Sequence, residues 1–232
     1  MERIETITHS IFNYLLFRLN TLGLDSDRRN FGEIRHLLDE ETIFSPDEFA
    51  KECFYVICVA GFKQDRAKEM CDRVIDFISK NPEFGEGDLI KIYGNALKVR
   101  SIGNVWHNRH KYHGQFYSLS SPAEKVEFLG TLPHIGNITK YHLARNLGLN
   151  FVKYDIWIQR LGTALCGRPE DMGLVNNSKL IAKTKEYCDR MFDDLLKITG
   201  EKVGFIDVVL WRSCQKGLLK IQNSQVFLDK NI

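Results

Sequence analysis

Two short segments in the middle of the chain hold the residues best suited to chemistry. The first is a tight turn between two helical patterns, Leu132-Pro133-His134-Ile135-Gly136. A turn of this kind leaves backbone N–H groups pointing outward, and with the dipole of the helix that follows they bind a phosphate without any side chain. The turn therefore predicts a phosphate contact, although a plain connection between two helices has the same pattern.

The second segment contains Asp155, which follows the turn after one further helical pattern. An ionised carboxylate stabilises positive charge that develops during a reaction, and it can also orient an attacking water. Asp155 precedes the apolar run from Ile156 to Leu165, where an aspartate ordinarily caps the start of a helix. In isolation the capping role is favoured, whereas the turn upstream favours catalysis.

Together the two segments resemble the helix-hairpin-helix DNA glycosylases, in which a hairpin L-P-G-[IV]-G precedes a segment D-x-H-[VI]-x-R with a catalytic aspartate. His134 replaces the hairpin glycine, and Trp157 replaces the histidine after the aspartate. The residues that match are Leu132, Pro133, Ile135, Gly136, Asp155 and Arg160. The resemblance implies an all-α, two-lobed fold and an enzyme of base excision repair that hydrolyses the N-glycosidic bond of a damaged or modified base.

Such chemistry requires the base to be flipped out of duplex DNA. By resemblance, Asp155 is the catalytic residue, and the leading substrate is 8-oxoguanine or a similar purine. The resemblance implies contacts to DNA phosphates at Leu132, Pro133, His134, Ile135, Gly136, Ile138, Thr139 and Lys140. It implies a base pocket or an intercalating loop at Gly61, Phe62, Lys63, Gln64, Trp157, Asp207 and Trp211, with a core position as the alternative for Trp211.

One residue of the family's reaction is missing. Bifunctional members carry a lysine two residues after the last hairpin glycine, and Ile138 occupies that position here. Lys140 is more than half a helical turn away, so we expect it to contact solvent or phosphate. The resemblance therefore predicts a monofunctional glycosylase. No close four-cysteine spacing exists for an iron-sulfur cluster, no cofactor is expected, and a structural monovalent cation at the hairpin stays open.

Two other functions remain open. Hairpins of this kind also occur in proteins that only hold DNA, and the replacements at His134 and Trp157 leave room for an enzyme that acts on hypermodified viral DNA bases. For the basic and aromatic stretch from Lys98 to His113, two interpretations stay open: contact with backbone phosphates or a splayed base, and a solvated helix face. His107, His110 and His113 have helical spacing, but no matching carboxylate or cysteine accompanies them, so we expect no metal site.

Helices must position these segments, because apolar residues recur at three-and-four spacing through most of the chain. Ser45-Pro46-Asp47-Glu48 and Ser121-Pro122-Ala123-Glu124 are helix starts. We expect further helices from about residue 64, over 88–100, from 103, over 138–147, 156–165 and 178–198, and from 207. We expect residues 45–147 to form the lobe ending in the hairpin and residues 1–44 and 148–232 to form the lobe with Asp155, with the active cleft between the two lobes.

Composition narrows the class of protein. The formal charge of +2 and the pI of about 8.2 are too small to indicate a nucleic-acid partner by themselves. A DNA-binding face must therefore come from local clusters of basic residues. The longest apolar runs are too short to cross a bilayer, and the first helical segment does not resemble a secretory signal. Six scattered cysteines indicate thiols in a reducing compartment. We expect a monomer in the cytoplasm, on the nucleoid in a prokaryote, bound to double-stranded DNA and to no membrane.

Overall fold

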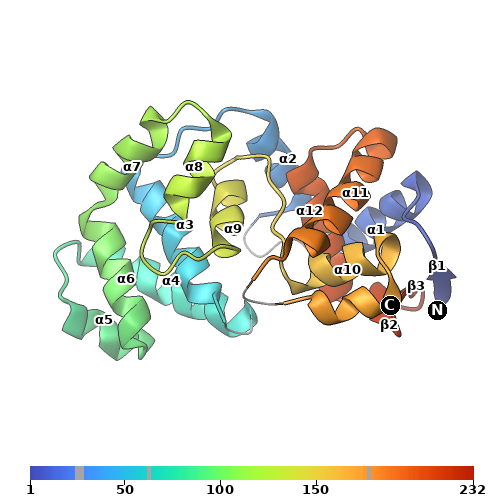
Figure 1. Ribbon diagram of the computed structural model, residues 1–232. Helices are drawn as coiled ribbons and strands as arrows, with labels where there is room; N and C mark the ends of the chain where they lie inside the picture. Colours follow the sequence, from blue (N-terminus) through green and yellow to red (C-terminus); the bar gives the residue numbers. More distant parts are fainter. Residues whose placement is uncertain (24–28, 62–63, 177–178) are drawn as a thin grey trace. The chain divides into compact units, whose positions relative to one another are not determined.

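The chain folds into two compact units of helices (Figure 1). The computed structural model describes residues 1–23, 29–61, 64–176 and 179–232, without the side chains of residues 64–67. One unit comprises Glu41–Leu149, and the other combines Met1–Glu40 with Asn150–Ile232. These boundaries lie a few residues from those expected from the sequence.

The unit of residues 41–149 is built around one apolar helix, α3. Nearly every side chain of α3 from Phe49 to Cys58 is buried, and the helix packs against α4, α6, α7 and α9. Its helices are α3 (Pro46–Val59), α4 (Gln64–Lys80), α5 (Glu86–Tyr93), α6 (Ala96–His107), α7 (Arg109–Ser118), α8 (Pro122–Leu129) and α9 (Thr139–Asn146).

The two helix starts expected from their Ser-Pro sequences are confirmed. Ser45 and Ser121 each accept a hydrogen bond from the backbone N–H of the glutamate three residues later, whose carboxylate accepts one in return. The single helix expected over residues 88–100 is wrong. Gly94 ends α5 in the left-handed conformation, with a φ of 71°, as glycine often does at a helix C-terminus. The Asn95 side chain then starts α6 by accepting from the N–H of Lys98, and α6 runs through Gly103 to His107.

The other unit joins the two ends of the chain. Helix α10 packs against α11, and α12 packs against α1, α2 and α10. Its elements are β1 (Glu2–Ile4), α1 (His9–Thr21), α2 (Phe31–Asp39), α10 (Ile156–Cys166), the 3-10 helix η1 (Pro169–Leu174), α11 (Ala182–Thr199), α12 (Val203–Gln215), β2 (Leu219–Gln222) and β3 (Gln225–Leu228). Within the described ranges, no helix is both long and apolar enough to span a membrane.

A small antiparallel sheet, not expected from the sequence, closes this unit. The strand order is β1-β3-β2, so the N-terminal strand pairs with the last strand and both ends of the chain meet there (Figure 1). Asn223 and Ser224 connect β2 to β3 with φ values of 48° and 60°. Two successive residues with positive φ are typical of the two-residue turn that matches strand twist.

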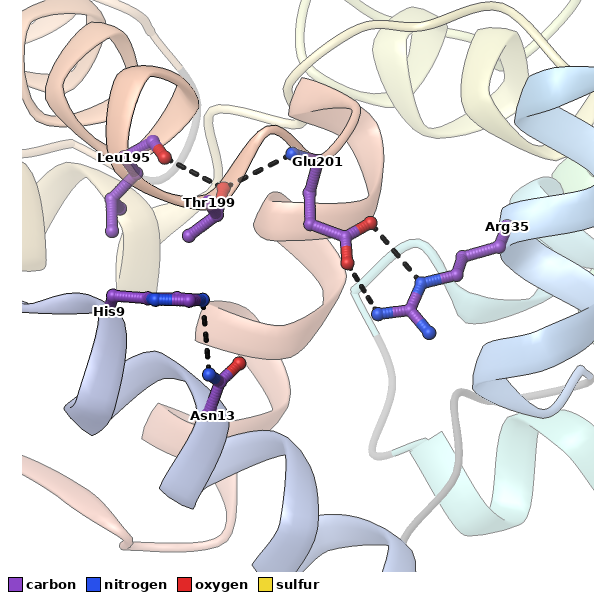
Figure 2. Close-up of polar contacts among 6 residues, drawn as sticks. All are labelled: His9, Asn13, Arg35, Leu195, Thr199 and Glu201. Atoms are coloured by element: carbon purple, nitrogen blue, oxygen red, sulfur yellow. Dashed lines mark hydrogen bonds and ion pairs between the residues drawn. The ribbon is translucent and has the colours of Figure 1, made fainter.

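Helix α2 is held to the turn between α11 and α12 by an ion pair (Figure 2). The Arg35 guanidinium donates through Nε and a terminal nitrogen to both carboxylate oxygens of Glu201. The same guanidinium lies 4.3 Å from the ring centroid of Phe205 on α12. The Thr199 hydroxyl, which donates to the Leu195 carbonyl, accepts from the N–H of Glu201 and fixes the start of this turn.

We expect Arg35→Met to lower the free energy of unfolding by about 1 kcal/mol, because it removes a two-pronged ion pair and a cation–π contact that are both partly solvated. Urea unfolding followed by circular dichroism measures this. Arg73→Met is the matched control, since Arg73 pairs with Glu69 along the exposed surface of α4. Equal losses in the two variants would show that the Arg35 contacts add nothing beyond an ordinary surface pair.

Candidate active site

Asp155 is the N-cap of helix α10. Its Oδ1 accepts hydrogen bonds from the backbone N–H groups of Trp157 and Ile158, at 3.0 and 3.2 Å. The side chain keeps 15% of its surface exposed. The two roles considered for this residue therefore do not exclude each other, because capping occupies Oδ1 and Oδ2 lies apart from the cap.

Lys153 faces the second oxygen of Asp155. The Asp155 N–H donates to the Lys153 carbonyl at 2.7 Å. The backbone therefore makes a three-residue turn that folds residue 153 back towards residue 155. Lys153 Nζ lies 3.7 Å from Asp155 Oδ2, and the lysine side chain is 16% exposed. Lys153 is not among the residues expected at the site, although it lies two residues before Asp155 in the sequence.

Helix α12 supports this pair. Asp207 is fully buried, and its Oδ2 accepts from the backbone N–H of Lys153 at 3.2 Å. Trp211 lies one helical turn further on. The Lys153 ammonium is 5.5 Å from the ring centroid of Trp211. Three residues expected at the site, Asp155, Asp207 and Trp211, are thus brought together in one unit, and Lys153 contacts all three.

Three further side chains, those of Trp157, Arg160 and Cys214, lie near the start of α10. Trp157 is half-buried, and the guanidinium of Arg160 lies 5.9 Å from its ring centroid. Cys214, on the last turn of α12, is buried near the carboxylate. Burial, reinforced by the negative charge of Asp155, raises the pKa of the Cys214 thiol well above its ordinary value. Cys214 therefore stays a neutral thiol beside the acid.

The hairpin turn lies in the other unit, between α8 and α9. Leu132 and Ile135 are buried and anchor the turn. His134 is exposed and has a φ of 64°, which is the left-handed conformation that a glycine adopts without strain. The Gly136 N–H donates to the Thr139 hydroxyl at 2.7 Å, and the Lys140 N–H donates to the Gly136 carbonyl at 2.9 Å. The turn keeps a glycine-like backbone although the glycine is replaced.

We expect His134→Gly to keep or raise stability by up to about 1 kcal/mol, because glycine removes the steric cost of the left-handed conformation. His134→Val is the informative contrast. A β-branched residue is a true outlier at positive φ, so we expect a loss of about 1–3 kcal/mol. Thermal unfolding of both variants measures the difference. Equal stability of the two would contradict the left-handed conformation.

The ammonium of Lys140, on α9 just after the hairpin, is already engaged in an ion pair. Lys140 Nζ donates to both carboxylate oxygens of Glu127 on α8, at 2.7 and 2.9 Å, and only 10% of the lysine side chain is exposed. The ion pair with Glu127 takes the place of the solvent contact expected for Lys140, and the expected phosphate contact stays a prediction. Ile138, at the position of the family's lysine, is half-buried and caps α9 without a side-chain hydrogen bond.

The loop expected to enter DNA starts from a well-anchored helix end. Lys98 is buried, and its Nζ donates to the carbonyls of Cys58 and Ala60 at 2.9 and 2.6 Å. Gly61 follows, exposed, with a φ of 74°. Phe62 and Lys63 lie outside the described residues, and so does the side chain of Gln64 at the start of α4.

The basic and aromatic stretch from residue 98 to 113 does not form one charged face. Lys98 is buried, and Arg109 pairs with Asp47 and lies 4.0 Å from the Trp106 ring centroid. His107 ends α6 and stacks on Phe84, whereas the later histidines belong to α7, so one helix does not carry all three. Among the described residues, no three His, Cys, Asp or Glu side chains are grouped to hold a metal ion.

Comparison with known proteins gives matches among solved structures. No protein-family model matches the chain, and no curated protein sequence matches it. The Methanocaldococcus jannaschii 8-oxoguanine glycosylase/lyase, solved with a 15mer DNA containing 8-oxoguanine, is similar with a TM-score of 0.61 and 16% identity. That alignment covers 89% of this chain and 100% of the archaeal chain.

A bacterial enzyme gives the same result. The 8-oxoguanine DNA glycosylase of Thermotoga maritima is similar with a TM-score of 0.57 and 18% identity, over 87% of this chain and 94% of that one. Identities this low show the fold and not the activity. The all-α fold expected from the hairpin and the Asp155 segment is therefore confirmed: this chain has the fold of the 8-oxoguanine DNA glycosylases.

Proposed function

We propose that this protein is a DNA glycosylase of base excision repair, which hydrolyses the N-glycosidic bond of a damaged or modified base flipped out of double-stranded DNA. Asp155 is the catalytic carboxylate. Bond cleavage leaves positive charge on the sugar, and an ionised carboxylate stabilises that charge and orients the attacking water.

The observation that carries this proposal is that the Asp155 carboxylate is held in one direction yet stays partly exposed, in a chain with the fold of the DNA glycosylases. Its Oδ1 is held by two backbone N–H groups of α10, which fixes the direction of the carboxylate. The side chain is still partly exposed, so a substrate and a water can reach it. A carboxylate that served only as a cap would not need a partly buried lysine beside its other oxygen.

The leading substrate is 8-oxoguanine or a similar purine. Support comes from the neighbouring structures, which are 8-oxoguanine DNA glycosylases, one of them solved with DNA containing that base. The hairpin supports DNA binding, because a turn with a glycine-like backbone at the start of α9 presents N–H groups to a phosphate.

We propose that the reaction stops at base release, without an efficient strand-cleaving step. The archaeal neighbour is a glycosylase/lyase. In this chain Ile138 stands where the resemblance places the reactive lysine, and the carboxylate of Glu127 on α8 holds the ammonium of Lys140. An ammonium in such a pair is a poor nucleophile, because attack on the sugar requires the neutral amine.

We further propose a monomer that acts on DNA in the cytoplasm, or on the nucleoid in a prokaryote. The reaction needs only water and the carboxylate, and the cysteine spacing does not match an iron-sulfur site, so we propose no catalytic cofactor. A structural monovalent cation at the hairpin is compatible with this. Base release is expected to persist in EDTA.

The test is incubation with duplex oligonucleotides that carry a panel of lesions, 8-oxoguanine first and hypermodified pyrimidines included, each analysed with and without alkali. We expect release of a base and strand breaks only after alkali. Breaks without alkali would contradict the assignment of Ile138. Tight binding to duplex DNA with no base released from any member would favour a protein that only holds DNA.

A further inference from the structure

The pair formed by Lys153 and Asp155 is unusual for a surface ion pair. The two side chains keep only 16% and 15% of their surfaces exposed. The backbone of the lysine is fixed at two points, since its N–H donates to buried Asp207 and its carbonyl accepts from Asp155. Its side chain is held by the ion pair and by the Trp211 ring, whose centroid lies 5.5 Å from the ammonium. A long lysine side chain loses conformational freedom when held in this way. A lysine held in one conformation at this entropic cost is more typical of a functional residue than of a surface ion pair.

Breaking a glycosidic bond separates two opposite charges. The sugar becomes cationic, and the departing base takes the bonding electron pair and becomes anionic unless it is protonated. A carboxylate helps only the first of these charges. An ammonium a few ångströms from the carboxylate matches the second, and a positioned acid of this kind contributes about 10²–10⁴-fold to a reaction rate.

Resting on the proposed function, we propose that Lys153 is a second catalytic residue, the proton donor to the departing base, and that Lys153 and Asp155 work as one acid–base pair. Lys153 does not take over the nucleophilic role of the missing hairpin lysine. Its side chain and Asp155 belong to one unit of the fold, so the pair is complete within residues 150–232.

The proton balance of this pair closes on itself. The bond between C1′ and the base nitrogen breaks with its electrons going to the base, which receives a proton from Lys153 Nζ. A water oxygen bonds to C1′, and Asp155 Oδ2 takes the proton that this water gives up. The two groups lie 3.7 Å apart in the resting pair, and a small movement of the lysine side chain brings them to the hydrogen-bond distance that proton transfer requires. The proton then returns from Asp155 to the Lys153 amine, so one water is consumed and the ion pair is restored.

The ion pair also changes the charge beside Asp155 in the course of the reaction. In the resting pair the ammonium neutralises part of the Asp155 charge. When Lys153 gives up its proton, Asp155 loses this counter-charge at the moment when positive charge on the sugar is greatest. An interaction that is stronger in the transition state than in the ground state accelerates the reaction. Trp211 and Asp207 are positioning residues in this scheme, since they hold the lysine and not the base.

The closing experiment compares single-turnover base release by wild-type protein, Lys153→Met, Lys153→Arg and Lys185→Met. The probe is duplex DNA carrying 8-oxoguanine, or the best substrate of the lesion panel. Lys185 is the matched control, because its ammonium also pairs with an aspartate, Asp189, and lies 5.1 Å from a tyrosine ring centroid in the same unit.

We expect Lys153→Met to slow base release by about 100-fold with an unchanged dissociation constant for DNA. Lys153→Arg keeps the charge and the packing but does not give up a proton near neutral pH, so it stays at least about tenfold slow. Lys185→Met remains within about twofold of the wild type. Borohydride traps no covalent adduct with any variant.

Several results would overturn the proposal. Base release by Lys153→Met within about threefold of the wild type would remove Lys153 from the reaction. Full activity of Lys153→Arg would exclude the proton transfer. A borohydride adduct formed by the wild type and lost in Lys153→Met would make Lys153 a nucleophile. If the wild type releases no base from any duplex, the proposed function itself fails, and the inference fails with it.

Discussion

Asp155→Asn is expected to slow base release by about 1000-fold while leaving both the fold and the affinity for DNA intact. The size of this loss is that of removing one group that stabilises charge in a transition state, and it corresponds to about 4 kcal/mol. Asparagine is as good a helix N-cap as aspartate, so its side-chain oxygen keeps the hydrogen bonds from Trp157 and Ile158. The substitution removes the charge and little else.

The measurement is single-turnover release of base, with DNA affinity from fluorescence anisotropy and the melting temperature taken on the same samples. Asp193→Asn, on the exposed surface of α11, is the matched control and is expected to behave as the wild type. Base release by Asp155→Asn within about tenfold of the wild type would show that Asp155 is only a helix cap. A carboxylate that stabilises charge in the transition state loses more rate than this when its own charge is removed.

Local signals in the sequence predicted the helices that lead to the site. Ser45 and Ser121 specify their helix starts through capping boxes, because every partner lies within three residues. The helix expected over residues 88–100 failed at Gly94 and Asn95, which are turn residues inside an otherwise continuous apolar pattern. The strands β2 and β3 were missed because each has only four residues. The strand β1, which pairs with β3, lies at the other end of the chain.

Part of the candidate site could be proposed from the sequence. Asp155 and the hairpin were proposed because each motif is contiguous in the sequence, and their roles in the reaction stay predictions. The role of Lys153 depends on a turn between residues 153 and 155 and on buried Asp207, far along the chain, which no local pattern encodes. Lys98 was read as part of a basic surface, whereas it is buried at the end of α3. Side-chain direction decided both cases, and sequence spacing alone does not give it.

Gly162→Ala is expected to lower the free energy of unfolding by about 3 kcal/mol, the upper part of the range for overpacking in a core. Helices α10 and α11 approach each other closely at this glycine. A Cβ atom at residue 162 would lie 2.8 Å from Cys188 Sγ, 2.9 Å from Cys188 Cα and 3.0 Å from Cys188 N. Two of these atoms are backbone, so relief requires a shift of a whole helix.

The matched control is Gly114→Ala, in the exposed part of α7, where an added Cβ would meet no atom within 4 Å. That change is expected to stabilise the protein by about 0.5–1 kcal/mol, because alanine is the better helix former. Urea unfolding of the two variants measures the expected loss of stability in Gly162→Ala and the expected gain in Gly114→Ala. A loss below about 0.5 kcal/mol for Gly162→Ala would contradict the close approach of the two helices.

Gly162→Ala also tests whether the packing of α10 against α11 positions the Asp155 carboxylate. Asp155 caps α10, so a helix pushed away from α11 carries the carboxylate away from Lys153, whose backbone stays tied to α12 through Asp207. We therefore expect the fraction of Gly162→Ala that remains folded to release base more slowly than the wild type. Folded Gly162→Ala protein with the wild-type rate would show that the position of the carboxylate does not depend on the packing of α10 against α11.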